Sequence, residues 1–530
     1  MTYDVIVVGG GIAGLTATAY LARDKKKVLL IDKNKECGGL VNTFEKDGFL
    51  FDAGVRALLN AGIIKPMLED LGIELNFLRS YVSLGIENEI LNIDNIENLE
   101  TYRKILEKFF PDSKKEIDWL LEEVRRIMKH VGVLYGVTNP AFKNVLKDKD
   151  YLFRELLPWL PRFLFTIGKI YKTDTPVEEY LEKHISNSSL RDIVSQHFFR
   201  GVPAFFALSY FSFYLDYLYP RGGVGKLADA LVRKVEDYGG VIKQETLVTS
   251  VNLGEKVLFD SNGNSYHYDF LIWAADLKTF YRIADPQGLN LKLKRKFEEA
   301  KKKILAGKGG DSVYTLFLGV DEPPESFSKL SHGHFFYAPK TIGLGQIHRL
   351  ELKKMLANWD NVKKENLFEW LDRFLELNSY EISIPSLKDL GMSPPGKTGL
   401  IISFLTDYEL FKKVFDRGWY EEFVGHIESK IVEIFTVCLY PFLKEKIIFK
   451  FSFTPISIEK RIASSEGAIT GWSFEEPIPV VNKIHKSTKS VLTPLPYVFQ
   501  AGQWTYSPSG VPIAILTGKL AADAVLKKLR

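Results

Sequence analysis

The amino-acid sequence predicts an α/β fold, and three observations indicate it. An apolar run, YDVIVV, leads directly into the glycine-rich stretch GGGIAGLTATAYLA at Gly9–Ala22. A basic turn follows, and then a second apolar run, VLLID, which ends at Asp32. The chain closes with another short apolar run, a glycine turn and a helical stretch. Strands that alternate with helices through glycine turns are typical of a doubly wound parallel sheet.

The glycine spacing Gly9-x-Gly11-x-x-Gly14 suits a strand-to-helix turn that holds a pyrophosphate. One glycine forms the turn, a second lets the backbone approach the phosphate, and a third lets helix and strand pack closely. Asp32, at the end of the second strand, is placed to accept hydrogen bonds from a ribose that carries no 2′-phosphate. We therefore expect a bound dinucleotide rather than an ordinary strand–turn–helix unit.

Two further segments favour FAD over NAD as the dinucleotide. After Asp32 the chain passes through Gly38-Gly39 and Asp52-Ala53-Gly54, where an NAD domain would normally go straight into another helix and strand. This glycine-rich path suits a chain that lies along an extended cofactor. The closing segment has a strand at Tyr497–Gln500 and a helix that opens near Val511-Pro512. Free N–H groups at that helix start would face the electron-rich pyrimidine edge of a flavin.

These segments, with the stretch Thr173–Asp276, resemble the phytoene desaturase, carotenoid isomerase and retinol saturase group of FAD-dependent oxidoreductases. This group belongs to the amine-oxidase-like flavoprotein superfamily. The resemblance rests further on the turn Tyr219-Pro220-Arg221-Gly222-Gly223, an amphipathic helix and the following strand. It implies that FAD contacts fall on Gly9, Gly11, Ile12, Ala13, Gly14, Asp32, Lys33, Gly38, Gly39, Leu40, Gly54, Val55, Val248, Gly502, Gln503, Val511 and Pro512.

The chain departs from the family pattern at three of these positions. Many relatives have a glutamate in place of Asp32, an aspartate in place of Gln503, and an arginine where Leu40 follows the paired glycines. Asp32 is shorter than glutamate but can make the same hydrogen bonds. Gln503 replaces a charge with an amide, so we expect flavin affinity and potential to differ from those of the relatives.

The nucleotide motifs lie at the start, middle and end of the chain, so the nucleotide domain must be assembled from separate segments. We assign residues 1–80, 215–280 and 451–530 to a Rossmann-type FAD-binding domain. Residues 81–214 and 281–450 then form an α+β substrate-binding domain, in which 81–214 read as mostly helical. The remaining part is predicted to contain strands at Asp311–Val320 and Gly399–Thr406 and helices at Lys363–Leu377 and Tyr420–Leu439.

Two apolar stretches bear on the substrate. Tyr151–Tyr171 mixes aromatic, basic and proline residues, which suits a helix lying in a membrane interface and equally a core helix pair with exposed basic ends. Pro203–Pro220 is too short to span a membrane. Its aromatic residues either line a tunnel for a long apolar substrate, as the resemblance implies, or pack as core.

Composition excludes several classes of function. The 530 residues carry 70 Lys and Arg against 66 Asp and Glu, so nothing favours a nucleic-acid partner. Cys37 and Cys438 form no disulfide framework, and no His or Cys spacing indicates a metal. No signal peptide or transmembrane helix is evident. We expect a cytoplasmic protein, with peripheral membrane association as an open alternative; the sequence does not indicate an oligomeric state.

The sequence does not assign a catalytic residue. Phe453–Pro477 resembles the stretch that borders the isoalloxazine in the family, where Glu466, Arg461 and Trp472 are the polar and aromatic candidates. An exposed structural role for Glu466 is the simpler interpretation. His332 and His334 alternate as on one strand face, but two imidazoles without a third ligand are more often structural.

Three functions remain open. The first is an FAD-dependent oxidoreductase that desaturates, saturates or isomerises double bonds of a long isoprenoid-like substrate, with FAD N5 exchanging the hydride. The second is a flavin-dependent amine oxidase. The third is a non-catalytic lipid-binding protein of the Rab GDP-dissociation-inhibitor type, which shields a prenyl chain without a flavin. The intact Gly9, Gly11 and Gly14 set favours the first two.

Overall fold

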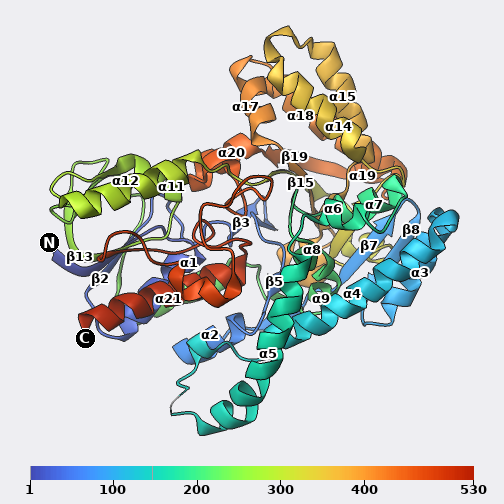
Figure 1. The fold of residues 1–530 in the computed structure, drawn as a ribbon. Coiled ribbons are helices and arrows are strands. Elements are labelled where there is room, and N and C mark those ends of the chain that lie inside the picture. The colour runs from blue at the N-terminus through green and yellow to red at the C-terminus, as the bar shows by residue number, and fades with distance from the viewer. Residues whose placement is uncertain (1, 146) are drawn as a thin grey trace.

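The structure is a computed structural model that describes residues 2–145 and 147–530. Its strands gather mainly into two sheets, which we call the first and the second sheet (Figure 1). The first sheet lies with α1, α11, α12 and α21 on the left of Figure 1, and the second lies among the helices on the right. Helices cover both sheets, which confirms the predicted α/β fold class.

The first sheet joins strands from the beginning, middle and end of the chain. At its centre β1 (Thr2–Val8), β2 (Val28–Ile31), β13 (Ser265–Trp273) and β20 (Val498–Gln500) run parallel. Around them lie β10 (Val241–Lys243), β11 (Val248–Asn252), β12 (Val257–Asp260) and β14 (Ala284–Asp285). Every residue of β2 is buried, as expected for a parallel strand that is covered on both faces.

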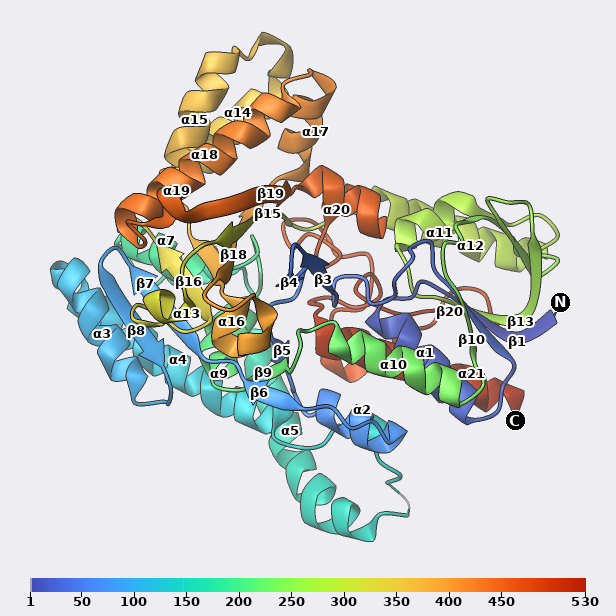
Figure 2. The same cartoon turned by 180° about the vertical axis from the view of Figure 1, so that it is seen from behind.

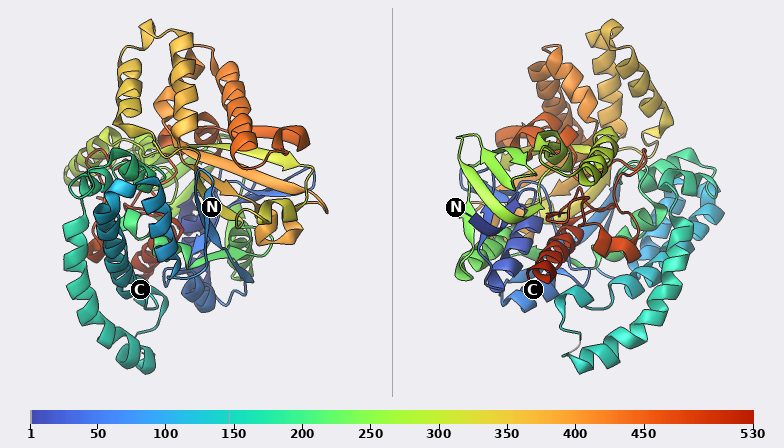
Figure 3. Two further views of the ribbon diagram at one scale, coloured as in Figure 1. Left: turned by 90° about the vertical axis from the view of Figure 1, so that its right-hand side faces the viewer. Right: turned by 60° about the vertical axis from the view of Figure 1, so that its left-hand side comes forward.

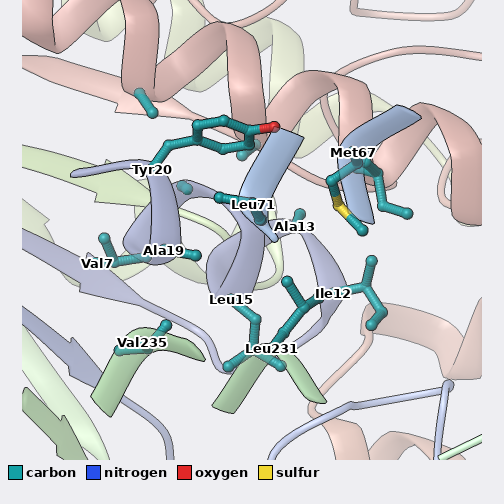
Figure 4. Close-up of a cluster of buried hydrophobic side chains, with 14 of the residues drawn as sticks. Val7, Ile12, Ala13, Leu15, Ala19, Tyr20, Met67, Leu71, Leu231 and Val235 are labelled. Carbon is teal, nitrogen blue, oxygen red and sulfur yellow. The ribbon is translucent and has the colours of Figure 1, made fainter. Parts of the chain in front are cut away.

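Side-chain alternation along β1 places the two faces of the first sheet in different cores. Val5 and Val7 pack with α1 (Ile12–Arg23), α10 (Lys226–Asp237) and α21 (Val511–Leu529), whereas Ile6 and Val8 pack with α11 (Leu277–Ile283) and α12 (Leu291–Ala306). In Figure 4, Ala19 of α1 lies beside Val7, and Leu15 of α1 lies next to Leu231 of α10.

The second sheet has the order β19-β15-β18-β17-β16-β7-β8. Its strands are β7 (Val82–Ile86), β8 (Glu89–Ile93), β15 (Ser312–Val320), β16 (His334–Ala338), β17 (Tyr380–Ser383), β18 (Thr398–Thr406) and β19 (Ile447–Phe453). The hairpin of β7 and β8 lies in the region that periodicity predicted as mostly helical, because two short strands give a weak signal beside long helices. β19 pairs with β15, so this sheet continues past residue 450.

Helices cover the second sheet in two groups. One group projects at the top of Figures 1 and 2 and consists of α14 (Gly345–Ala357), α15 (Lys364–Leu377), α17 (Tyr408–Asp416) and α18 (Tyr420–Cys438). The other contains α3 (Asn98–Phe109), α4 (Lys114–Tyr135), α6 (Val177–Glu182), α7 (Ser188–Ser195), α8 (Ala204–Leu208) and α9 (Tyr210–Tyr214). The bounds of α15 and α18 agree with the predicted helices to within one residue.

Shorter elements connect the two sheets. They are the hairpin of β3 (Thr43–Lys46) and β4 (Phe49–Asp52), the small sheet of β5 (Leu58–Leu59), β9 (Tyr217–Pro220) and β6 (Phe77–Arg79), α2 (Ile64–Leu71) and α20 (Pro455–Ile462). The remaining short helices are α13 (Pro324–Ser328), α16 (Pro385–Lys388) and α19 (Leu443–Lys446).

Helix α5 (Leu157–Ile170) continues from a π-helical turn at Tyr151–Leu156 and runs along the outside of the molecule. It reaches the bottom of Figure 1 and the left edge of the left view in Figure 3. Of the helices in the described part of the chain, none combines the length and apolar character needed to cross a bilayer.

Candidate functional site: a cavity between the two sheets

A cavity of about 570 Å³ lies between the first and second sheets. Its lining includes the glycine turn after β1, the start of α21, the aromatic residues of α8 and α9, and one face of the second sheet. A single cavity therefore joins the predicted nucleotide motifs to the predicted substrate region.

The three motif glycines occupy different environments, and the backbone explains each. Gly9 has φ +107°, in the left-handed region that favours glycine. A Cβ on Gly14 would lie 1.9 Å from the Gly9 carbonyl oxygen, so only glycine lets α1 start so close to the turn. A Cβ on Gly11 would meet no protein atom within 4 Å, although Gly11 lines the cavity. This open backbone at a helix start fits a pyrophosphate.

Asp32 directly follows β2 and lines the same cavity. One carboxylate oxygen accepts a hydrogen bond from the Gly10 N–H at 2.6 Å, and the other accepts from the Asn34 N–H at 2.7 Å. These bonds hold the carboxylate in place, and each oxygen keeps a lone pair for a further donor. The arrangement fits the predicted ribose diol.

The start of α21 forms a second helix N-terminus at the cavity. Gly510, Val511 and Pro512 line it, and Gly510 caps the helix without a side-chain hydrogen bond. The partial positive charge of this helix end therefore faces the cavity, where it would stabilise an electron-rich flavin edge. Gln503, also in the lining, donates from its amide nitrogen to Ser464 Oγ and the Ala468 carbonyl, both at 3.3 Å.

Most of the residues predicted to contact FAD line this one cavity. They are Gly9, Gly11, Ile12, Ala13, Asp32, Gly38, Gly39, Leu40, Gly54, Val55, Gly502, Gln503, Val511 and Pro512. Three predicted residues do not line it. Gly14 packs against the turn, Lys33 donates to the Lys460 carbonyl at 2.7 Å, and Val248 is buried at the start of β11.

Aromatic residues from Pro203–Pro220 form much of the opposite wall. Phe205, Phe206, Tyr210, Phe213 and Tyr217 line the cavity, and the same residues also belong to the hydrophobic cluster that includes α4. The wall continues toward α5, which contributes Ile167 and Ile170.

A polar group in this wall was missed by the sequence reasoning. Arg56, His334 and Glu381 line the cavity, and His334 Nε2 lies 2.9 Å from Glu381 Oε1. His332 is separate from this pair and lies 3.2 Å from Asp94, which rules out the two histidines acting together. One sequence signal could have indicated this group: the charged Glu381 lies within the strand YEIS, whose other residues are apolar or small.

The three candidates in Phe453–Pro477 lie outside the cavity lining. Glu466 pairs with Lys278 and accepts from the Gly309 N–H at 2.8 Å. Arg461 lies over the Phe453 ring, and Trp472 packs edge-on against Trp504 with ring centroids 4.8 Å apart. Their contacts indicate structural roles. Among the described residues, no group of His, Cys, Asp and Glu is arranged to hold a metal ion.

Comparisons with known proteins agree with this site. The chain is 24% identical to the all-trans-retinol 13,14-reductase of Danio rerio over 547 residues, covering 94% of this chain and 82% of the relative. It is 20% identical to the 4,4'-diapophytoene desaturase of Staphylococcus aureus strain COL, covering 99% of each chain. Putrescine oxidase bound to putrescine shares the fold, with a TM-score of 0.61, 14% identity and 99% coverage of each chain.

The family model described as flavin containing amine oxidoreductase matches residues 12–526, which include both cavity-facing helix starts and the whole second sheet. FAD is therefore the cofactor of this chain. The chain belongs to the flavin containing amine oxidoreductase family and is an FAD-dependent oxidoreductase.

Proposed function

We propose that this enzyme desaturates, saturates or isomerises carbon–carbon double bonds of a long apolar substrate of the isoprenoid or carotenoid class. The observation that carries the proposal is the aromatic wall of Phe205, Phe206, Tyr210, Phe213 and Tyr217, which shares one cavity with the cofactor motifs. The names of the two relatives, a retinol reductase and a diapophytoene desaturase, support the same substrate class.

The cofactor would be held mainly by backbone groups. Gly9 and Gly11 would place the pyrophosphate at the α1 N-terminus, Asp32 would bind the ribose, and Val511 at the α21 start would face the pyrimidine edge of the flavin. When bound, FAD supplies a hydride acceptor or donor at its N5 atom.

The residues of the chain would position the substrate and exclude water from it. Aromatic side chains offer large, rigid apolar surfaces that bind a polyene without demanding hydrogen bonds. Tyr210 and Phe213 contact each other edge-on at 5.5 Å, and Phe206 contacts both, so the wall is a packed unit. Such a wall fixes which carbons of a long chain lie next to the cofactor.

We further propose that α5 and the turn before it bind a phospholipid surface. Phe153, Leu157, Leu160, Leu164 and Phe165 are exposed large apolar residues in this segment. Exposed basic residues accompany them, namely Arg154, Arg162 and Lys169. Apolar side chains flanked by cations are suited to the interface of a membrane that contains anionic lipids. Since Ile167 and Ile170 of α5 line the cavity, substrate could pass from the lipid into it.

The amine-oxidase alternative is less well supported by the cavity. An ammonium substrate would need a carboxylate or an aromatic cage without competing cations. Glu381, the cavity carboxylate on the second sheet, is already bonded to His334, and Arg56 lies in the same lining. These positive and polar groups disfavour a cationic substrate.

The test begins with the absorption spectrum of the purified protein before and after anaerobic dithionite, which should show flavin bands that bleach. The oxidised holoenzyme and, separately, the reduced holoenzyme freed of dithionite are then mixed anaerobically with polyenes in liposomes, because desaturation needs oxidised flavin and saturation needs reduced flavin. Putrescine and cyclohexylamine are mixed with the oxidised holoenzyme. We expect the polyenes to change the flavin redox state or to be converted, as followed by chromatography. Flavin reduction by the amines alone would overturn the proposal in favour of an amine oxidase, and a protein that refuses FAD would overturn both.

A further inference from the structure

One face of the second sheet carries a row of polar side chains inside the otherwise apolar cavity wall. Thr315 of β15 lies opposite Ser403 of β18, and Ser403 lies opposite Glu381 of β17. All three line the cavity. The neighbouring residues on the other face, Leu316, Ile402 and Ile382, belong to the hydrophobic core beneath the helices. Strand alternation thus directs the polar row into the cavity.

Arg56 reaches this row from the loop after β4. It is 5% exposed, and its guanidinium donates to the Asp52 carbonyl and to Ser403 Oγ, the latter at 3.3 Å. It forms no ion pair within the described part of the chain. A buried guanidinium is costly when its donors are unmatched, and arginine carries five N–H groups. The unused donors of Arg56 therefore favour an oxygen acceptor within the cavity.

Glu381 supplies an acceptor on the same wall. His334 is bonded to one of its oxygens, and 34% of the Glu381 side chain is open, on the strand face that lines the cavity. Burial raises the pKa of Glu381, but the bond from His334 and the charges of Arg56 and Lys388 outweigh burial and lower it. Glu381 is thus an ionised carboxylate with a free oxygen.

We propose that Arg56 and Glu381 form a subsite for a hydroxyl group carried by the apolar substrate. A hydroxyl oxygen would accept from Arg56 while its hydrogen is donated to Glu381, so both charged groups are satisfied by one ligand group. A hydrocarbon would leave Arg56 and Glu381 without a hydrogen-bond partner. A carboxylate on the substrate would be repelled by Glu381, and an ammonium group would be repelled by the charges of Arg56 and Lys388. The proposal rests on the proposed function, since it specifies which long apolar molecules the cavity takes.

The test uses the oxidised holoenzyme and a matched pair of ligands: geranylgeraniol, and the hydrocarbon in which its hydroxyl is replaced by hydrogen. Binding is measured anaerobically by the change in flavin absorbance, so turnover is not required. We expect the alcohol to bind at least about tenfold more tightly, because hydrogen bonds to charged groups are lost with the hydrocarbon. The variant Glu381→Gln should reduce this preference about fivefold, because an amide makes a weaker bond than a carboxylate.

Asp174→Asn provides the matched control, since Asp174 also lines the cavity but pairs with Lys483 near α5. It should shift the affinities of both ligands equally. Equal binding of alcohol and hydrocarbon to the unmodified holoenzyme would overturn the subsite and leave the proposed function standing. Failure of both ligands and of other long apolar molecules to bind a flavin-loaded protein would instead overturn the proposed function. The comparison of alcohol and hydrocarbon binding by the wild-type holoenzyme tests the subsite even if the Glu381 variant does not retain flavin.

Discussion

The two walls of the cavity are built in different ways. The wall toward the first sheet consists largely of backbone, from the turn at Gly9–Gly11, the loop at Gly38-Gly39 and the start of α21. The wall toward the second sheet consists of side chains such as Phe206 and Glu381, which come from separate helices and strands. A cofactor held by backbone groups needs a short local motif, whereas a substrate held by side chains needs the whole tertiary arrangement.

The largest expected effect separates two glycines of the backbone wall. Gly14→Ala should lower the free energy of unfolding by about 3 kcal/mol or more and abolish FAD binding, because its Cβ would lie 1.9 Å from the Gly9 carbonyl oxygen. Gly11→Ala should leave the free energy of unfolding of the apoprotein unchanged, since its Cβ meets no protein atom, yet weaken FAD binding. Urea unfolding and flavin absorbance measure the two effects. An unchanged FAD affinity in Gly11→Ala would show that the cofactor does not approach this backbone.

Lys388 does not line the cavity, but it contacts the side-chain wall by donating to the Arg56 carbonyl at 2.8 Å, and it should affect the pH dependence of stability. Burial lowers the pKa of Lys388 to about 8, below its unfolded value. Between these two pKa values the unfolded chain binds more protons than the folded protein. The contribution of Lys388 to the free energy of unfolding is therefore lowest below pH 8 and should rise by about 2 kcal/mol from pH 7 to 9.5. Lys388→Met should remove this rise from the urea-unfolding profile of the apoprotein. An identical pH slope in the variant would contradict a lowered pKa at Lys388.

The proposed lipid-binding surface on α5 and the turn before it can be tested with vesicles of phosphatidylcholine and phosphatidylglycerol. The double variant Leu164→Asp, Phe165→Asp should cosediment about tenfold less than the wild type, since two exposed apolar side chains are replaced by charges. Val437→Asp is the control, because Val437 is 77% exposed on α18, in the projecting helical group at the other end of the molecule. An equal loss of cosedimentation in both variants would indicate nonspecific association with the vesicles rather than binding through α5.

The smallest effect is expected at a single aromatic residue of the cavity wall. Phe206→Ala should weaken binding of a long polyene severalfold, on the order of fivefold, through lost apolar contact, while FAD affinity stays unchanged. Phe368→Ala removes a similarly half-buried ring that packs over α18, away from the cavity lining, and should leave polyene binding as in the wild type. Weaker FAD binding by Phe206→Ala would contradict the assignment of cofactor binding to the backbone wall and of substrate binding to the side-chain wall.

Sequence reasoning succeeded where the determinants are local. The strand, turn and helix around Gly9–Gly14, the strand that ends before Asp32 and the helices α15 and α18 follow from periodicity and turn chemistry within short windows. Sequence reasoning was weaker for the β7–β8 hairpin, because each strand has only five residues. In addition, the parallel partner of β7, which is β16, lies far away along the chain.

By itself, the sequence determined the α/β class, the dinucleotide motif and the family, because backbone recognition of a phosphate requires only a few glycines at a set spacing. Tertiary structure alone decided that Arg56, His334 and Glu381 meet in one cavity wall and that Glu466 stays outside it. The physical reason is that the face to which a strand residue points, and the neighbours it meets there, depend on register between strands distant in sequence.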